Sequence, residues 1–199
     1  MRPLYGLAVA AFACGLMGAA PAPAGDRHVL GQYRARRIEL RKSLRDGVIV
    51  LFGRGEQDED LRTGFFQESN FYYLTGWQEP GAILLLAPLP DDSQAPGYAA
   101  RERLPREILF LPERNPDQEK WTGRKTAPDE QNVREITGFD AVMPAEKFEA
   151  ELRDMLQAYA RIYTLADQPA AARLKQLAPL RDIANAGPGI AKLRMVKSP

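Results

Sequence analysis

The sequence has almost none of the side chains that build thiol or imidazole chemistry. Its 199 residues include one cysteine, Cys14, and one histidine, His28. A structural zinc site needs a cluster of such ligands, so no site of this class is expected. A Ser–His–Asp hydrolase would have to use His28, which lies close to the signal-peptide cleavage site predicted below at Ala24.

The sequence also lacks an excess of charge of either sign. Lys and Arg together number 27, and Asp and Glu together number 26. Nucleic-acid binders usually carry a clear basic surplus, so we expect no nucleic-acid partner. Apolar residues make up 45% of the chain and aromatic residues 9%. These values are typical of a globular protein and exclude a coiled coil, a collagen-like repeat and a wholly disordered chain.

Residues 1–24 have the order of a secretory signal peptide. A positively charged start and an apolar run are followed by Ala22-Pro23-Ala24, which resembles a cleavage site. The run is too short for a stable membrane span, which needs about 20 apolar residues. An uncleaved anchor and a lipoprotein attached through Cys14 are the alternatives. Cleavage would export residues 25–199 to the periplasm or the medium without a cysteine, so stability would depend on a packed core.

Hydrophobic periodicity predicts several strands and helices in alternation. A continuous apolar run with glycine on both sides, residues 48–52, is typical of a buried central strand. Residues 145–159 carry apolar side chains on one helical face. The other expected strands are 71–75, 82–86, 108–111, an edge strand at 139–143 and a last strand at 162–165, and the other expected helices are 29–45, one that begins near residue 128, and 169–178. Such alternation favours an α/β domain with a mixed β-sheet flanked by helices.

Three polar patterns favour ordinary structure over a binding site. Gly53-Arg54-Gly55 follows a strand, as a phosphate loop would, but Asp58 stands where a third glycine is needed, which favours a plain turn. The basic residues of 34–45 could meet an acidic partner, although most such helices are solvated faces whose arginine stems cover apolar surface. The acids of 56–60 could bind a hard cation loosely, but they lack the spacing of a calcium loop.

Trp121 is a more informative residue than these patterns. It lies between charged residues in a segment expected to be a loop, and Gly123 follows it. Aromatic residues in such settings often serve ligand pockets or interfaces, and a core residue that caps the loop is an equally weighted alternative. The carboxylates show no helical or strand spacing that would pair them at a dimetal centre. The residues alone therefore assign no catalytic residue and no metal ligand.

Several segments, taken in order, resemble one family. These segments are Arg36-Arg37-x-x-Leu40 before a strand that ends at Phe52, then Phe66-Gln67-Glu68-Ser69-Asn70-Phe71-Tyr72-Tyr73-Leu74-Thr75-Gly76, Glu79-Pro80-Gly81-Ala82, Leu109-Phe110-Leu111-Pro112 and Glu119-x-Trp121-x-Gly123-Arg124. Together they resemble the amino-terminal, creatinase-like α/β domain of aminopeptidase P, the Xaa-Pro aminopeptidases. The resemblance covers about residues 30–199.

The resemblance implies a function and a missing part. Members of this family are manganese-dependent metallopeptidases that release the first residue of a peptide whose second residue is proline. They hold two metal ions through two Asp, one His and two Glu of a second, "pita-bread" catalytic domain. The final segment, which ends at Pro199, is similar to the segment at the join between the two domains, so no metal ligand can be assigned here and no cofactor is expected in this chain. In tetrameric relatives the tryptophan at the position of Trp121 reaches the active site of a neighbouring subunit.

Three hypotheses follow from the sequence. The first is a Xaa-Pro aminopeptidase domain that is inactive alone and meets proline-containing peptides through a catalytic domain or chain. The second is a freestanding peptide-binding or oligomerisation module, with self-association through an exposed former domain interface. The third is a truncated reading frame.

Overall fold

The computed structural model describes residues 24–55, 65–89, 107–166 and 170–196. Its strands are β1 (Gly47–Phe52), β2 (Ile83–Leu86), β3 (Glu107–Leu111), β4 (Ala141–Pro144), β5 (Arg161–Thr164) and β6 (Asp182–Asn185). They form one sheet in the order β4-β3-β2-β1-β5-β6. The two pairs β1–β2 and β2–β3 are antiparallel, whereas β3–β4, β1–β5 and β5–β6 are parallel. The predicted mixed sheet is therefore confirmed.

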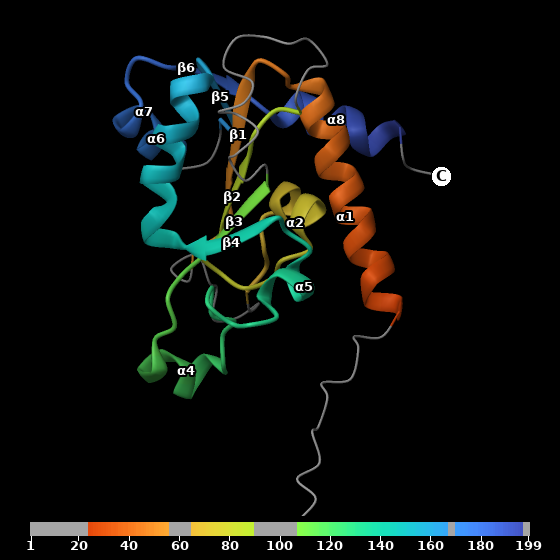
Figure 1. Cartoon of the computed structure of the whole chain (residues 1–199), viewed down its shortest axis with the longest axis vertical. Coiled ribbons are helices and arrows are strands. Elements are labelled where there is room, and N and C mark those ends of the chain that lie inside the picture. Colours follow the sequence, from red (N-terminus) through yellow and green to blue (C-terminus); the bar gives the residue numbers. More distant parts are fainter. Residues whose placement is uncertain (1–23, 56–64, 90–106, 167–169, 197–199) are drawn as a thin grey trace, which may run out of the picture.

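Helices cover both faces of this sheet (Figure 1). The helices are α1 (Ala24–Ser43), α2 (Ser69–Thr75), α4 (Pro116–Thr122), α5 (Val133–Thr137), the 3-10 helix η2 (Ala145–Lys147), α6 (Phe148–Ala158), α7 (Ala170–Leu177) and α8 (Gly187–Val196). Alternate strand residues point to opposite sides. One face packs on α1, α2 and α8 through Leu40, Phe71 and Ile190. The other face packs on α6 and α7 through Phe148 and Leu174.

The core confirms the prediction of a buried central strand. All six residues of β1 are buried, and β1 lies between β2 and β5. The expected strands 82–86 and 108–111 appear as β2 and β3, and the expected edge strand appears as β4 at one end of the sheet. Among the described helices, none combines the length and the apolar character that crossing a membrane requires.

The strand predicted at 71–75 is wrong, because these residues form helix α2. The Glu68 carboxylate accepts a hydrogen bond from the Phe71 amide at 2.6 Å and caps the helix start. Gly76 ends it with φ of 68°, a conformation that glycine adopts freely. Phe71, Leu74 and Thr75 are buried, which is the spacing of one helical face. The aromatic residues that suggested a strand are thus overruled by two caps and by packing against the core.

The strand expected at 162–165 is confirmed as β5, but it is not the last strand, because β6 and α8 follow β5 and α7. The sequence of β6, Asp-Ile-Ala-Asn, has little β propensity and none of its residues is fully buried. Its pairing with β5 comes from backbone hydrogen bonds, which leave no pattern in the sequence. The helix expected near residue 128 begins at Val133 as α5, and the helix expected at 29–45 spans 24–43 as α1.

The basic helix α1 is not simply a solvated face. Arg37 is fully buried and donates to Glu107 Oε2 at 2.8 Å, and Arg41 donates to Glu107 Oε1 at 2.9 Å. Burial lowers the pKa of Arg37, and the Glu107 carboxylate opposes this effect. The prediction of a solvated face is therefore wrong for these two arginines, which tie α1 to the first residue of β3.

Candidate functional site: an exposed tryptophan arm beside a cavity

The segment 53–55, which follows β1, and the turn at Pro80-Gly81 lie side by side and line part of the site. Gly81 has φ of 77°, and a Cβ atom there would lie 2.8 Å from the Pro112 ring, so the turn predicted at Pro80-Gly81 requires glycine. The Gly81 amide donates to the Arg54 carbonyl at 2.7 Å, and the Gly53 amide donates to the Ala82 carbonyl at 2.8 Å. The Arg54 amide is bound by Gln67 Oε1. These bonds occupy amides that a phosphate loop would offer to an anion, so the segment 53–55 is a plain connection.

Helix α4 carries the residue that the sequence singled out. Asn115 Oδ1 accepts hydrogen bonds from the Asp117 and Gln118 amides, and Pro116 fits the first helical position. Gly123 ends the helix with φ of 81°. The expectation that Trp121 lies in a loop is wrong, and so is the core alternative. Trp121 lies on α4 with 90% of its surface exposed.

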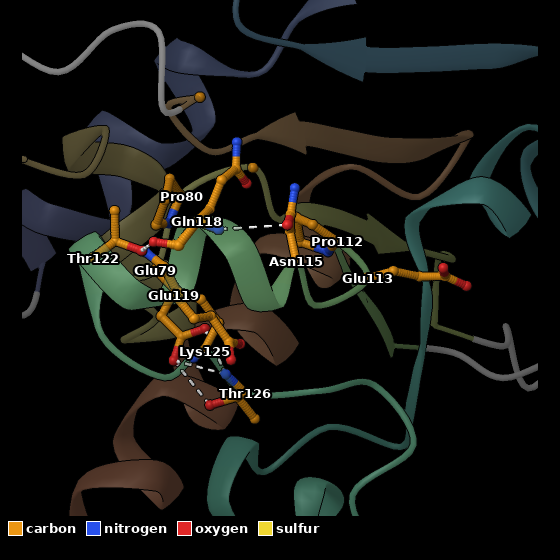
Figure 2. Close-up of a pocket in the computed structure, with 12 residues that line it drawn as sticks. Glu79, Pro80, Pro112, Glu113, Asn115, Gln118, Glu119, Thr122, Lys125 and Thr126 are labelled. Carbon is orange, nitrogen blue, oxygen red and sulfur yellow. Dashed lines mark hydrogen bonds between the residues drawn. The ribbon is translucent and has the colours of Figure 1, made fainter.

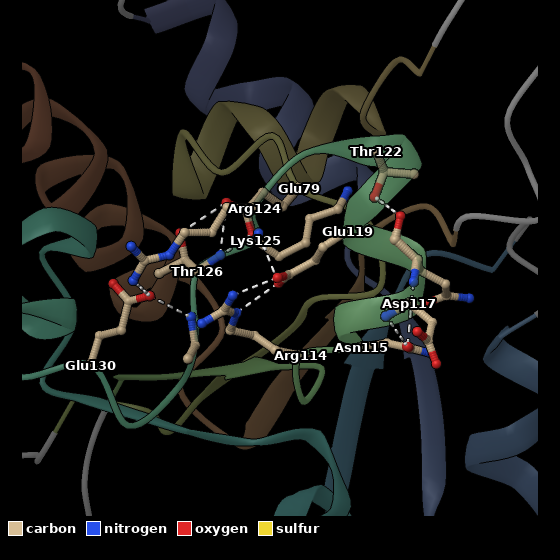
Figure 3. Close-up of polar contacts among 12 residues, drawn as sticks. Glu79, Arg114, Asn115, Asp117, Glu119, Thr122, Arg124, Lys125, Thr126 and Glu130 are labelled. Atoms are coloured by element: carbon tan, nitrogen blue, oxygen red, sulfur yellow. Dashed lines mark hydrogen bonds and ion pairs between the residues drawn. The ribbon is translucent and has the colours of Figure 1, made fainter.

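Glu119 joins the two ends of α4. Its carboxylate accepts two hydrogen bonds from the Arg114 guanidinium, at 2.6 and 2.5 Å, and one from the Lys125 amide at 3.1 Å (Figure 3). The hydrogen bonds from Arg114 lower the pKa of Glu119 to about 2. The bidentate pairing with arginine has the geometry of a strong ion pair.

Two further carboxylates hold the segment that follows α4. Glu79 accepts hydrogen bonds from the Thr126 hydroxyl at 2.8 Å and from the Thr126 amide at 3.1 Å. Glu130 accepts one from the Ala127 amide at 3.1 Å and pairs with Arg124. The backbone hydrogen bond from Ala127 lowers the pKa of Glu130. These carboxylates act as anchors for backbone amides.

A cavity of about 440 Å³ lies between α4 and the turn at Pro80-Gly81. Figure 2 shows side chains from both segments around it. Its lining residues are Gly55, Glu79, Pro80, Gly81, Pro112, Glu113, Asn115, Gln118, Glu119, Thr122, Lys125 and Thr126. The lining combines proline rings with carboxylates and amide groups. The arrangement can therefore present apolar contact and hydrogen-bond acceptors to a ligand or a neighbouring domain.

The described residues do not fit a metal centre. Within the part of the chain that the structure describes, no group of three or more His, Cys, Asp or Glu side chains converges to hold an ion. Glu79 and Glu119 are engaged with backbone and side-chain donors, and His28 is exposed on α1, where it contacts Gln32. We derive no hydrolytic step from these residues. The acids of 56–60 and the predicted signal peptide lie outside the described residues, Ala24 apart.

The structure brings together two motif segments that are far apart in the sequence. The Glu79-Pro80-Gly81 turn and the segment around Trp121 face the same cavity. The sequence analysis did not predict that Glu119 and Glu79 act as anchors. It also did not predict that the amides of Lys125 and Thr126 donate hydrogen bonds to them. The one hint in the sequence was that Glu79 and Glu119 each lie in a segment that resembles the family. Their partners include backbone amides, which every residue except proline has, so the sequence could not indicate them.

The architecture places the chain in the class of three-layer α/β/α domains with a mixed sheet. A family model described as "Aminopeptidase P, N-terminal domain" matches residues 33–163. The chain belongs to this family, the N-terminal domain of the Xaa-Pro aminopeptidases.

Named relatives agree with this assignment. The chain is 38% identical over 96 residues to human Xaa-Pro aminopeptidase 3, a match that covers 48% of this chain and 17% of the relative. It is 28% identical over 180 residues to the Xaa-Pro aminopeptidase of Haemophilus influenzae, covering 84% of this chain and 37% of the relative. Aminopeptidase P of Escherichia coli shares the fold with a TM-score of 0.66 and 21% identity, covering 85% of this chain and 40% of that chain. The chain thus spans less than half the length of these relatives.

Proposed function

We propose that this chain is the recognition domain of a Xaa-Pro aminopeptidase. Hydrolysis would take place in a metal-binding catalytic domain, joined to it or supplied by another chain, with manganese as the metal. The match to an N-terminal-domain model and the coverage of only 37% of the Haemophilus influenzae relative support two domains with separate roles. The substrate class is peptides with proline as the second residue.

The exposure of Trp121 is the observation that carries this proposal. A large aromatic side chain with 90% of its surface in solvent lies on a helix that is anchored by ion pairs and amide hydrogen bonds. An aromatic face packs well against a proline ring and loses little side-chain entropy on binding. A structure of the Escherichia coli relative contains the inhibitor Pro-Leu. We propose that Trp121 contacts such a proline-containing peptide at the active site of a neighbouring catalytic domain, in the same molecule or in a homo-oligomer.

The test measures release of the first residue from a Xaa-Pro peptide. The purified chain, with and without Mn²⁺, should show no turnover above the peptide blank. The chain fused at Pro199 to an aminopeptidase P catalytic domain should be active. Turnover by the chain alone that persists through stringent purification would contradict the division of labour.

We further propose that residues 1–24 direct export to the periplasm or the medium. Helix α1 begins at Ala24, so cleavage after this residue would leave all the other elements of the fold intact. Amino-terminal sequencing of the protein recovered outside the cytoplasm should begin at Gly25. Recovery from the cytoplasm with an intact amino terminus would contradict export.

A further inference from the structure

Helix α4 is held in place without a hydrophobic anchor. None of its seven residues is buried, and none belongs to either core cluster. A helix this short has little stability of its own, and most helices in proteins are stabilised by packing an apolar face. Figure 1 shows α4 apart from the sheet and from the helices that cover it. Its position must therefore depend on polar contacts.

Glu119 supplies such contacts at both ends of the helix. Arg114 precedes α4, and its guanidinium pairs with the carboxylate at 2.5 and 2.6 Å. Lys125 follows α4, and its amide binds the same carboxylate at 3.1 Å. The Glu119 side chain is 10% exposed and its partner Arg114 is 36% exposed. One carboxylate thus closes the segment 114–125 into a loop around the helix.

We propose that Glu119 is the positioning residue of Trp121. Residues two positions apart on a helix do not face each other, so Glu119 fixes the α4 backbone while the indole remains free to meet a ligand. Under the proposed function, on which this inference rests, a fixed α4 presents the aromatic ring without an entropic penalty at the moment of binding. Loss of the carboxylate would leave Trp121 in the chain but would let the helix move.

Glu79 is a second anchor, but it acts at one point. In the part of the chain that the structure describes, the Glu79 carboxylate accepts hydrogen bonds from one residue, Thr126, through its hydroxyl and its backbone amide. The turn that contains Glu79 is fixed to the segment just after β1 by the hydrogen bond from the Gly81 amide to the Arg54 carbonyl. Glu79 thus ties the segment that follows α4, at Thr126, to the Pro80-Gly81 turn, whereas Glu119 links the two ends of the segment 114–125.

The experiment measures the mobility of Trp121 in the full chain. The sequence holds two tryptophans, and Trp77→Phe leaves Trp121 as the single fluorophore. Time-resolved anisotropy then separates nanosecond motion of the segment from tumbling of the molecule. In this background, Glu119→Gln should at least double the amplitude of the nanosecond component. Arg114→Leu, which removes the ion pair from the other side, should do the same.

Glu113→Gln is the matched control. Glu113 lines the same cavity and carries the same charge, and no ion pair described for the resolved ranges joins it to α4. Its anisotropy decay should equal that of the Trp77→Phe parent. Far-UV circular dichroism and the melting temperature verify that the core is intact, which we expect because no residue of α4 belongs to either core cluster. Unchanged decay in both folded variants, Glu119→Gln and Arg114→Leu, would overturn the proposal.

This readout is independent of catalysis. A mobile Trp121 in Glu119→Gln supports the positioning role even if the fused enzyme hydrolyses peptides equally well with and without Trp121, a result that would refute only the proposed function. An anisotropy decay of Trp121 that is unchanged in both Glu119→Gln and Arg114→Leu refutes the positioning role even if Trp121→Ala slows the fused enzyme.

Discussion

At the scale of single residues, Glu107 has the largest predicted effect on stability. Its carboxylate is 1% exposed and pairs with two buried guanidinium groups, those of Arg37 and Arg41. Removing one partner of a buried ion pair leaves charge without compensation and costs about 3–5 kcal/mol. We predict that Glu107→Gln lowers the free energy of unfolding by this amount in urea denaturation. A loss below about 1 kcal/mol would show that the arginines find other partners.

Two glycines should respond to alanine with opposite signs. Gly76 has φ of 68°, and a Cβ atom there would lie 2.3 Å from the Tyr33 ring. We predict that Gly76→Ala destabilises the protein by at least about 1–2 kcal/mol, the cost of a left-handed alanine before the clash is counted. Gly31 lies within α1 and has open space around it. Gly31→Ala should stabilise by about 0.5–1 kcal/mol, because alanine is the better helix former. Equal effects of the two changes, measured by thermal unfolding, would contradict this account.

The residue scale also shows how far the sequence alone could lead. Trp121 was singled out from its charged neighbours and a following glycine, and the structure places it on the surface. The partners of Glu119 could not be predicted in this way, because one of them is a backbone amide and the other lies in a segment expected to be a loop. The buried pairing of Arg37 with Glu107 spans 70 positions and needs the fold to bring its members together.

At the scale of elements, α4 should tolerate acid. The hydrogen bonds from Arg114 place the pKa of Glu119 at about 2, below its ordinary value of 4.5. The stabilisation from this carboxylate is therefore complete above about pH 4.5 and is lost as the pH falls through about 2. Arg114, Arg124 and the amide of Lys125 are the groups that face it and hold it ionised. We predict that the anisotropy of Trp121 in the Trp77→Phe protein is constant from pH 7 to pH 4.5. A transition centred near pH 4.5, without unfolding of the core, would contradict the ion pair.

Elements with a strong internal pattern were predicted well, and the others were not. The apolar runs of β1, β2 and β3 appear within one residue of their expected positions, and the periodic helix expected at 145–159 appears as η2 followed by α6. Helix α2 was mistaken for a strand because its aromatic residues favour strands locally, whereas Glu68 and Gly76 determine the outcome through capping. Strand β6 was missed because its residues lie at the sheet edge and do not need to be apolar.

At the scale of the whole molecule, the family, the fold class and the mixed sheet followed from the sequence and are confirmed. The order of the strands did not follow, because β1 is paired with β5 across more than a hundred positions. The sequence also did not predict that the turn after Glu79 and helix α4 line the same cavity. These features arise from long-range pairing, for which a single sequence offers no local signal.

The central claim is that this domain recognises peptides through Trp121 and leaves hydrolysis to another domain. The most direct measurement is kcat/KM for a Xaa-Pro peptide, using the chain fused to an aminopeptidase P catalytic domain, with Trp121 or with Trp121→Ala. Ile136→Ala, which removes another exposed apolar side chain, is the control. We predict a loss of at least about tenfold for Trp121→Ala, equivalent to about 1.4 kcal/mol of transition-state stabilisation, and no change for Ile136→Ala. Equal kcat/KM for all three proteins would contradict the claim.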